Sequence, residues 1–467
     1  MKKNSLKFLL GLFILFTLFI LFNQFDMTLP PGSYREKDLE PTIFNKDNGF
    51  YMVFALSEPP GVDIHSEEII NKYRRLFDPR LGDTDRFRYR WDQEAYRRRF
   101  HSYLRKARFI NQKKTDWITF VKSREREILA LKPRFSFLLE RFEKLLACDI
   151  MADFSIPRFL LHPNYPHEYF YPYPDKTALL TVCRLYTALR ILEILEGRID
   201  GVQSILDQIS FAKKLIQSAR TSYTNLLGKK VLCLSLEALN NLMNRDDCPK
   251  EIFSRVFNGL NPLKYEEFGS RKAFIGYYLA MEEWIENKLE SVKRHTIMGD
   301  AGRLFLQKNH TKYYYFNYVS NCIEYEKQPP FKWKPHQLAA KNLQKGSFWW
   351  LQNAIGKMIF SKDSIPDLRP DILASYQTKV LYDLTRISAE LHLNYTHDQP
   401  IKEILNRLES FRTPDPYSGG PYIWDKKKAI LYSVGSNRRD DGGVVDSSQQ
   451  LEEEMLDIVI PCVLHAK

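Results

Sequence analysis

Apolar side chains recur with helical spacing most regularly in the middle of the chain. In the segment Lys176–Glu196, for example, Leu185 and Leu189 lie four positions apart, and similar spacing returns in Ile199–Ala219 and Thr221–Met243. Apolar residues three and four positions apart share one face of an α-helix. Because only short breaks separate these segments, they predict three neighbouring antiparallel helices.

Other parts of the chain show weaker versions of the same pattern. No fixed repeat length relates these segments to one another, so the pattern does not indicate a repeat array. The additional predicted helices are Lys132–Met151, Pro249–Asn258, Arg271–Lys293, Lys332–Phe360, Asp371–Asn394 and Ile401–Leu408.

The N-terminus combines a basic tail with an uninterrupted apolar run. Lys2, Lys3 and Lys7 precede the segment Phe8–Phe22, and Phe25 extends its apolar character. No small-residue cleavage site follows, so the pattern favours an uncleaved signal anchor over a cleaved signal peptide. The prediction is a transmembrane helix over residues 8–25 in the inner membrane, a cytoplasmic tail over 1–7, and a periplasmic or extracytoplasmic body.

The rest of the chain divides by composition. Residues 26–66 read as a Pro-containing linker with a docking segment, since the stretch Asn48–Leu56 is too apolar to stay in solvent. Residues 67–360 form a predicted helical body. Residues 371–467 form a smaller C-terminal unit.

Apart from Asn48–Leu56, which is either a short buried strand or the first turn of a helix, strand signals lie in that C-terminal unit. The β-prone runs Pro421–Trp424 and Ala429–Val434 flank the polar turn Asp425–Lys428. Aromatic and β-branched residues on both sides of a polar turn are typical of a β-hairpin. The predicted fold class is therefore mainly α: a single N-terminal transmembrane helix, a multi-helix body, and a small α+β C-terminal unit with a β-hairpin.

Composition and charge narrow the function classes. With 44% hydrophobic and 27% charged residues, the chain is not wholly disordered. Between Lys72 and Lys144, 22 Lys and Arg face 10 Asp and Glu, an excess that equals the net charge of +12 of the whole chain. The densest part, residues 86–108, interleaves arginines with aromatics. Three interpretations remain open: a solvated helix face, contact with anionic lipid, and nucleic-acid binding, the last being disfavoured.

A cluster of acids follows the predicted hairpin. It stands beside the glycine pair Gly442–Gly443, and carboxylates with carbonyl oxygens at a tight turn suit a hard cation such as Ca²⁺. A solvated acidic surface explains the same composition, and both interpretations stay open. The acids are Asp440, Asp441, Asp446, Glu452, Glu453, Glu454 and Asp457.

The sequence carries no recognisable catalytic motif. It has no glycine-rich phosphate loop, no nucleophile elbow and no HExxH pair, and its six cysteines do not have metal-site spacing. The prediction is a non-enzymatic binding or structural component of the cell envelope, with a protein partner there. The alternative is a hydrolase that acts on an envelope polymer.

The order of elements after Asp371 resembles the C-terminal half of the major pseudopilin of type II secretion. A long helix, a short helix, Pro414–Asp415–Pro416, a hairpin and an acidic Gly-Gly loop follow one another, and Asp457–Ile458 comes last. The motif LYSVG…DDGG is also similar to the ending of a group of envelope proteins of environmental bacteria. That second likeness implies a location and no activity.

The pseudopilin resemblance implies a calcium site in the C-terminal unit. It assigns the carboxylate ligands to Asp440, Asp441 and Asp457. Backbone carbonyls near Leu431 and Ser433 would complete the shell, with Asn437 as a further ligand. A divalent ion would offset the repulsion between the carboxylates, so metal binding would be coupled to folding of the unit.

Overall fold

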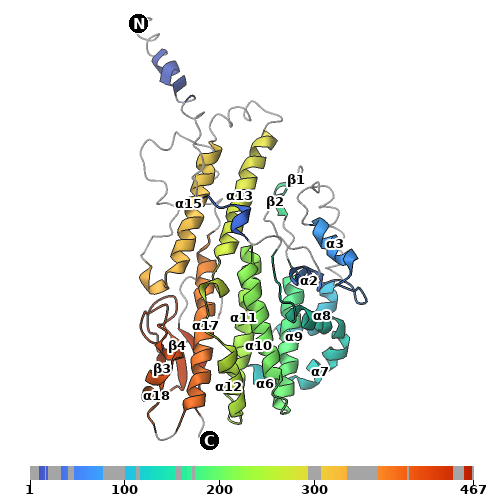
Figure 1. Ribbon diagram of the computed structural model, residues 1–467, viewed down its shortest axis with the longest axis vertical. Helices are drawn as coiled ribbons and strands as arrows, with labels where there is room; N and C mark the ends of the chain where they lie inside the picture. Colours follow the sequence, from blue (N-terminus) through green and yellow to red (C-terminus); the bar gives the residue numbers. More distant parts are fainter. Residues whose placement is uncertain are drawn as a thin grey trace.

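Figure 1 shows the computed structural model of the chain, in which α-helices dominate. The mainly helical class predicted from the sequence is confirmed. The residues that the structure describes are 10–15, 17–18, 21, 33–39, 47–76, 100–111, 116–153, 160–162, 165–170, 174–292, 307–333, 367–396, 399–444 and 457–464.

The centre of the molecule is a bundle around α11 (Ser222–Met243). It packs against α10 (Gly201–Ser218) on one side and α17 (Arg369–Asn394) on another, and it also contacts α9 (Lys176–Leu195). The three helices predicted between residues 176 and 243 are confirmed to within two residues at each end. The fourth long helix, α17, confirms the prediction for Asp371–Asn394.

Side-chain caps explain where two of these helices begin. The Asp175 carboxylate accepts a hydrogen bond from the Ala178 amide at the start of α9. The Thr221 hydroxyl does the same for the Thr224 amide at the start of α11. Each cap supplies an acceptor to an amide that has no partner within the helix, which is typically worth about 1 kcal/mol.

Polar side chains link α11 to its neighbours by hydrogen bonds at three positions along the helix. Gln208 Nε2 on α10 donates to Ser235 Oγ at 2.7 Å. Asn240 Nδ2 donates to Thr385 Oγ1 on α17 at 2.8 Å. Further along the same pair of helices, Lys229 Nζ lies 2.7 Å from Ser375 Oγ. All of these residues are buried, so the bundle core is not purely apolar.

A layer of shorter helices covers one side of the bundle, some of them directly on α9 and the others packed on those helices (Figure 1). Their apolar sides face inward, and α2 is buried along its whole length, as the apolar stretch Asn48–Leu56 predicts. The elements are α2 (Phe50–Ala55), α3 (Glu67–Leu76), η2 (Arg105–Ala107), α5 (Arg108–Asn111), α6 (Trp117–Ser123), α7 (Glu125–Arg134) and α8 (Ser136–Leu146).

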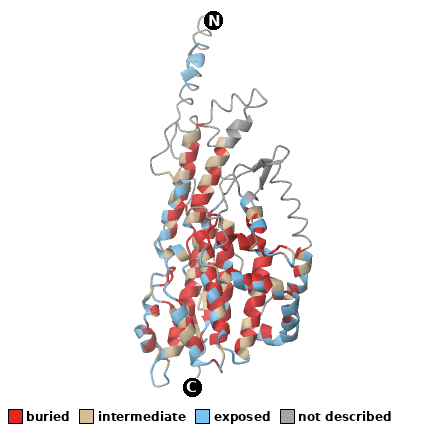
Figure 2. Ribbon diagram, turned by 45° about the vertical axis from the view of Figure 1, so that its right-hand side comes forward, coloured by how far each residue is buried: buried red, intermediate tan, exposed pale blue. Residues whose placement is uncertain are grey.

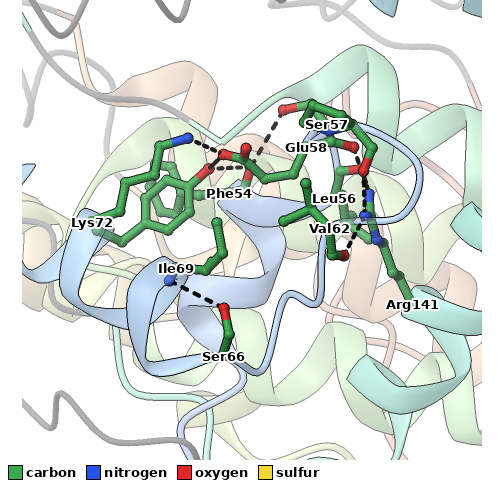
Figure 3. A network of polar contacts seen from close by, with 11 residues as sticks. Phe54, Leu56, Ser57, Glu58, Val62, Ser66, Ile69, Lys72 and Arg141 are labelled. Carbon is green, nitrogen blue, oxygen red and sulfur yellow. Dashed lines mark hydrogen bonds and ion pairs between the residues drawn. The ribbon is translucent and has the colours of Figure 1, made fainter.

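A buried arginine fixes α2 to α8. The Arg141 guanidinium donates to the carbonyl oxygens of Glu58, Pro59 and Val62 at 2.6, 2.8 and 2.9 Å, and more weakly to that of Leu56 at 3.4 Å (Figure 3). The carbonyls of Glu58, Pro59 and Val62 lie in the turn that follows the end of α2 at Ala55. One side chain of α8 therefore holds the whole turn that leaves α2.

Two long helices rise beyond the bundle as the α13–α15 helical hairpin (Figure 1). They are α13 (Arg271–Val292) and α15 (Lys308–Lys327). Near the N-terminus of the chain, the Tyr34 ring packs against Tyr278 and Phe316 of this hairpin, with ring centroids 5.9 and 5.2 Å apart.

In the C-terminal unit, the residues that follow α17 pack on that helix and contain a three-stranded antiparallel sheet of order β3-β4-β5. The predicted hairpin is confirmed as β3 (Ile423–Asp425) and β4 (Ile430–Ser433). The third strand, β5 (Ile458–Pro461), pairs with β4. Smaller elements complete the fold: β1 (Leu160–His162) with β2 (Tyr165–Phe170), α12 (Lys250–Gly259), η1 (Glu36–Asp38), η3 (Tyr265–Glu267), η4 (Pro330–Lys332), α18 (Ile401–Arg407) and η6 (Ser410–Arg412).

The predicted N-terminal transmembrane helix is wrong. Within the ranges that the structure describes, no helix is both long enough and apolar enough to cross a membrane. A bilayer needs about 20 consecutive apolar residues in one helix. The helical positions described near the N-terminus are 10–15, 17–18 and 21.

Two further predictions fall largely outside the described residues. Of the helix predicted over Lys332–Phe360, only residues 332–333 are described, at the end of η4. Of the basic segment 86–108, only residues 100–108 are described. There Phe100, Leu104 and Ala107 are buried while Arg105 and Arg108 are exposed, so this part has one apolar face and one charged face. Figure 2 shows the buried positions concentrated on the facing sides of the long helices.

Candidate functional site

The acidic loop predicted from the sequence lies against the start of β5. The Asp457 side chain, 3% exposed, folds back onto the loop Asp440–Gly443. Its Oδ2 accepts a hydrogen bond from the Gly443 amide at 2.6 Å, and its Oδ1 makes a longer contact with the Asp441 amide at 3.4 Å. Gly442 and Gly443 have φ of +72° and +73°, a left-handed conformation that favours glycine.

The other two aspartates are held within the loop. Asp440 Oδ1 accepts from the Tyr432 hydroxyl at 3.0 Å and from the Gly442 amide at 2.9 Å. Asp441 Oδ2 accepts from Asn437 Nδ2 at 2.6 Å. Asn437 therefore positions Asp441 through its amide nitrogen.

Charge repulsion remains in this loop. Burial raises the pKa of the Asp457 carboxyl, and the neighbouring Asp441 and Asp440 raise it further, while hydrogen bonds from the Gly443 and Asp441 amides lower it in part. The pKa of Tyr432 is raised to about 12, first by burial and then by its hydrogen bond to Asp440. Both pKa shifts reflect burial of the side chain together with negative charge on the neighbouring carboxylates.

The carbonyl ligands implied by the resemblance are less favourably placed. Leu431 sits in the middle strand and pairs with Trp424 on one side and Ile460 on the other. Because carbonyls of a central strand point toward one neighbouring strand or the other, that of Leu431 belongs to the sheet. Ser433 pairs with Ile458, and its hydroxyl donates to Asp415 at 2.7 Å.

An ammonium group already reaches one carbonyl of the loop. Lys428 Nζ donates to the Gly442 carbonyl oxygen. In the described part of the chain, no group of three or more His, Cys, Asp and Glu side chains is arranged to hold a metal ion. The structure thus gathers Asp440, Asp441 and Asp457 around one loop, but the six implied ligands do not surround a common point.

A second polar cluster, which the sequence did not reveal, lies inside the molecule. We call it the four-helix junction: Lys229 of α11, Ser270 before α13, Glu326 of α15, and Asp371 and Ser375 of α17. Lys229 Nζ lies 2.9 Å from Ser270 Oγ and 2.7 Å from Ser375 Oγ. Glu326 accepts from the Ser270 amide at 2.8 Å and from Ser375 Oγ at 2.6 Å.

The junction contains groups that catalyse reactions in other settings. A lysine beside a serine hydroxyl is one arrangement that activates a serine nucleophile. Here Ser270 and Ser375 are 1% and 0% exposed, so a substrate cannot reach either hydroxyl in this conformation. In this conformation the junction holds the four helices together, and its buried serines are closed to substrate.

A cysteine and a histidine also meet in the C-terminal region. Cys462 Sγ lies 3.9 Å from His392 Nε2, and the Ser388 hydroxyl lies 3.5 Å from the same sulfur. Burial raises the pKa of the Cys462 thiol to about 12. Because the thiolate is the nucleophile, a buried protonated thiol is a packing residue.

One open pocket of about 490 Å³ lies at the turn between α9 and α10. Arg190, Arg198 and Arg255 line it, which suggests an anion site at first sight. Each arginine, however, is paired with at least one carboxylate, at distances of 2.6–2.8 Å. The pocket therefore offers no excess positive charge to an anion.

Comparison with known proteins gives no match: no family model, curated protein or solved structure corresponds to this chain. The resemblance to the major pseudopilin stays a prediction that rests on the sequence motifs alone.

Proposed function

We propose that the protein is a non-enzymatic structural or binding component of the cell envelope. The observation that carries the proposal is the role of α17, which joins three parts of the molecule. Ser375 contacts Lys229 of the bundle. The Tyr376 hydroxyl donates to the Glu326 carbonyl of α15 at 2.5 Å, and Asp383 accepts from Tyr422, just before β3, at 2.9 Å. Polar side chains of α17 therefore hold separate segments of the chain together. The envelope location is supported only by the sequence motifs.

Co-purification of the full chain from its native cells tests this function. We expect one protein partner in a fixed ratio, identified by mass spectrometry after mild crosslinking. A bound glycan or lipid fragment that is chemically changed during incubation with the protein would contradict the proposal and favour an enzyme.

A hydrolase that acts on an envelope polymer is the second candidate. One observation favours it: the hydroxyls of Ser270 and Ser375 both accept a hydrogen bond from Lys229 Nζ, at 2.9 and 2.7 Å. A fluorophosphonate probe, which labels activated serines, should leave the full chain unlabelled. Labelling that disappears in Ser375→Ala or Ser270→Ala, but persists in Ser388→Ala, would overturn the non-enzymatic proposal.

For the C-terminal unit we propose calcium binding through Asp440, Asp441 and Asp457. Its support is the contact of Asp457 with the loop that carries Asp440 and Asp441. The pKa of Asp457 is raised by burial and also by these two carboxylates, and a divalent cation would offset their repulsion. Binding to the folded form alone would stabilise it by roughly 2.7 kcal/mol at a hundredfold excess of Ca²⁺ over Kd.

The calcium proposal predicts a change in thermal stability of the full chain. Addition of Ca²⁺ should raise the Tm and a chelator should lower it. The double variant Asp440→Asn with Asp441→Asn should lose this response, while Glu403→Gln, an exposed acid of α18, should keep it. A wild-type melting curve that is identical with Ca²⁺ and with chelator would favour the solvated acidic surface.

A further inference from the structure

The four-helix junction sits at the base of the α13–α15 helical hairpin. Ser270 immediately precedes α13 and Glu326 is the penultimate residue of α15, so both ends of the hairpin meet α11 and α17 there. The five junction side chains are between 0% and 7% exposed. Any change in their charge therefore acts on the attachment of the hairpin to the bundle.

The hydrogen bonds of Lys229 match those of an ammonium ion. Its Nζ has three acceptors: Ser270 Oγ, Ser375 Oγ and the Asp371 carbonyl oxygen at 3.2 Å. An ammonium has three protons to donate, and no lone pair is left over. Both serines are free to accept because Ser375 donates its own proton to Glu326, and Ser270 donates to Asn225 at 3.2 Å.

Glu326 balances this positive charge. Its carboxylate receives the Ser375 hydroxyl, the Ser270 amide and the Tyr265 hydroxyl, the last at 2.7 Å. One cation and one anion are thus linked through the Ser375 hydroxyl. With these two groups alone the junction is neutral and its donors and acceptors are matched.

Besides Glu326, the junction contains a second acid, the Asp371 carboxyl. Its Oδ1 is buried, and no hydrogen-bond partner for it is found among the described residues. The titratable groups that face it are Lys229 from α11, Glu326 and Cys322 from α15, and Asp367 just before α17, with the Ser222 hydroxyl as a hydrogen-bond partner. An ionised Asp371 would leave the junction with one unbalanced negative charge away from water, which is unfavourable.

We propose that the four-helix junction is a proton-dependent attachment point for the α13–α15 helical hairpin. With Asp371 protonated, the junction is neutral and the hairpin is held firmly on α11 and α17. When Asp371 loses its proton, the unbalanced charge weakens this attachment and the base of the hairpin opens more often.

The titration of Asp371 supports the direction of the effect. Burial, with smaller contributions from Glu326 and Asp367, raises the pKa of this carboxyl to about 6, against the opposing effects of Lys229 and the Ser222 hydroxyl. The folded pKa is thus above the unfolded value of 3.8. The stabilisation by the bound proton is complete below the unfolded pKa and is lost as pH rises to about 6. The difference of about two units between the folded and the unfolded pKa corresponds to a roughly hundredfold change in the opening equilibrium over the whole titration.

Hydrogen exchange of the full chain at about pH 5 and about pH 7.5 tests the proposal, with rates corrected for intrinsic pH dependence. In the wild type, amides at the start of α13 and the end of α15 should lose roughly tenfold in protection at the higher pH, because pH 5 lies only about one unit below the folded pKa of Asp371. Amides of α9 and α10 should change much less.

Two variants separate Asp371 from other acids. Asp371→Asn should give nearly equal protection of the hairpin base at both pH values. Glu324→Gln is the matched control, since Glu324 is an exposed acid near the end of α15 that pairs with Lys327, and it should behave as wild type. Should Asp371→Asn fail to fold, the wild-type series still decides. Equal protection of the hairpin base at both pH values, or an equal loss in α9 and α10, would overturn the proposal, as would an unchanged pH response in a folded Asp371→Asn.

Discussion

Replacement of Arg141 by methionine should destabilise the region around α2 selectively. Methionine keeps much of the aliphatic volume but removes every hydrogen bond to the turn after α2 (Figure 3). It also removes the contact of the guanidinium with the Phe137 ring, whose centroid is 5.1 Å away. The carbonyls of Glu58, Pro59 and Val62 then lose a charged donor.

The size of the effect follows from these contacts. A hydrogen bond to a charged group contributes about 1.5–3 kcal/mol, and three short ones give an upper sum of roughly 4.5–9 kcal/mol. The turn can relax and admit water, because the residues from Pro59 to Val62 are partly exposed. The expected loss of unfolding free energy is therefore about 3–5 kcal/mol. Arg141→Lys should lose less, since it keeps the charge but not the forked geometry.

Urea unfolding followed by circular dichroism, together with hydrogen exchange of residues 50–62, measures the loss. The matched control is Lys144→Met, an exposed position on the same helix, which should stay within about 0.5 kcal/mol of wild type. If Arg141→Met unfolds at the same urea concentration as Lys144→Met and exchange over residues 50–62 is unchanged, the inferred role of Arg141 is refuted.

Two further substitutions probe the other attached parts. Gly443→Ala should lower the stability of the C-terminal unit by about 1–3 kcal/mol in a thermal melt, because a Cβ there would lie 2.2 Å from Ile430 Cδ1 and φ is +73°. The control is Gly420→Ala, where the nearest atom to an added Cβ is 3.7 Å away, and it should be near neutral in the same melt. Lys312→Met should weaken the α13–α15 helical hairpin by about 1–3 kcal/mol, since Lys312 is 8% exposed in its side chain and bonds Glu286 at 2.6 Å. Faster hydrogen exchange within α13 and α15 would report it, and unchanged exchange would contradict it.

The helices that could be predicted are those with a single apolar face. Segments such as α10 and α12 place apolar residues on one face and polar residues on the other clearly enough to set their limits. The helix α15 was missed because Tyr313, Tyr314, Tyr315 and Phe316 are consecutive, and four aromatic residues in a row cover all sides of a helix. It becomes recognisable only when its partner α13 and the Tyr34 segment cover those sides.

The candidate sites were predictable to different degrees. The approach of Asp457 to the loop Asp440–Gly443 could be anticipated from the order of motifs. The four-helix junction could not, because Lys229 stands beside Lys230 in the sequence and reads as a solvent-exposed position. Its partners Ser270 and Ser375 lie 41 and 146 residues away along the chain. Only the tertiary fold brings compensating groups to a buried lysine.

The polar contacts along α11 have a consequence for folding fidelity. Apolar faces of two helices can pack almost equally well after a slip of one turn, about 5.4 Å, since many leucines are interchangeable. Such a slip would part Lys229 from Ser375 and Asn240 from Thr385, and each of these buried side chains would then lose one hydrogen bond. The matched polar pairs thus favour the observed alignment of α11 with α17, because a slipped packing of the two helices gives up buried hydrogen bonds.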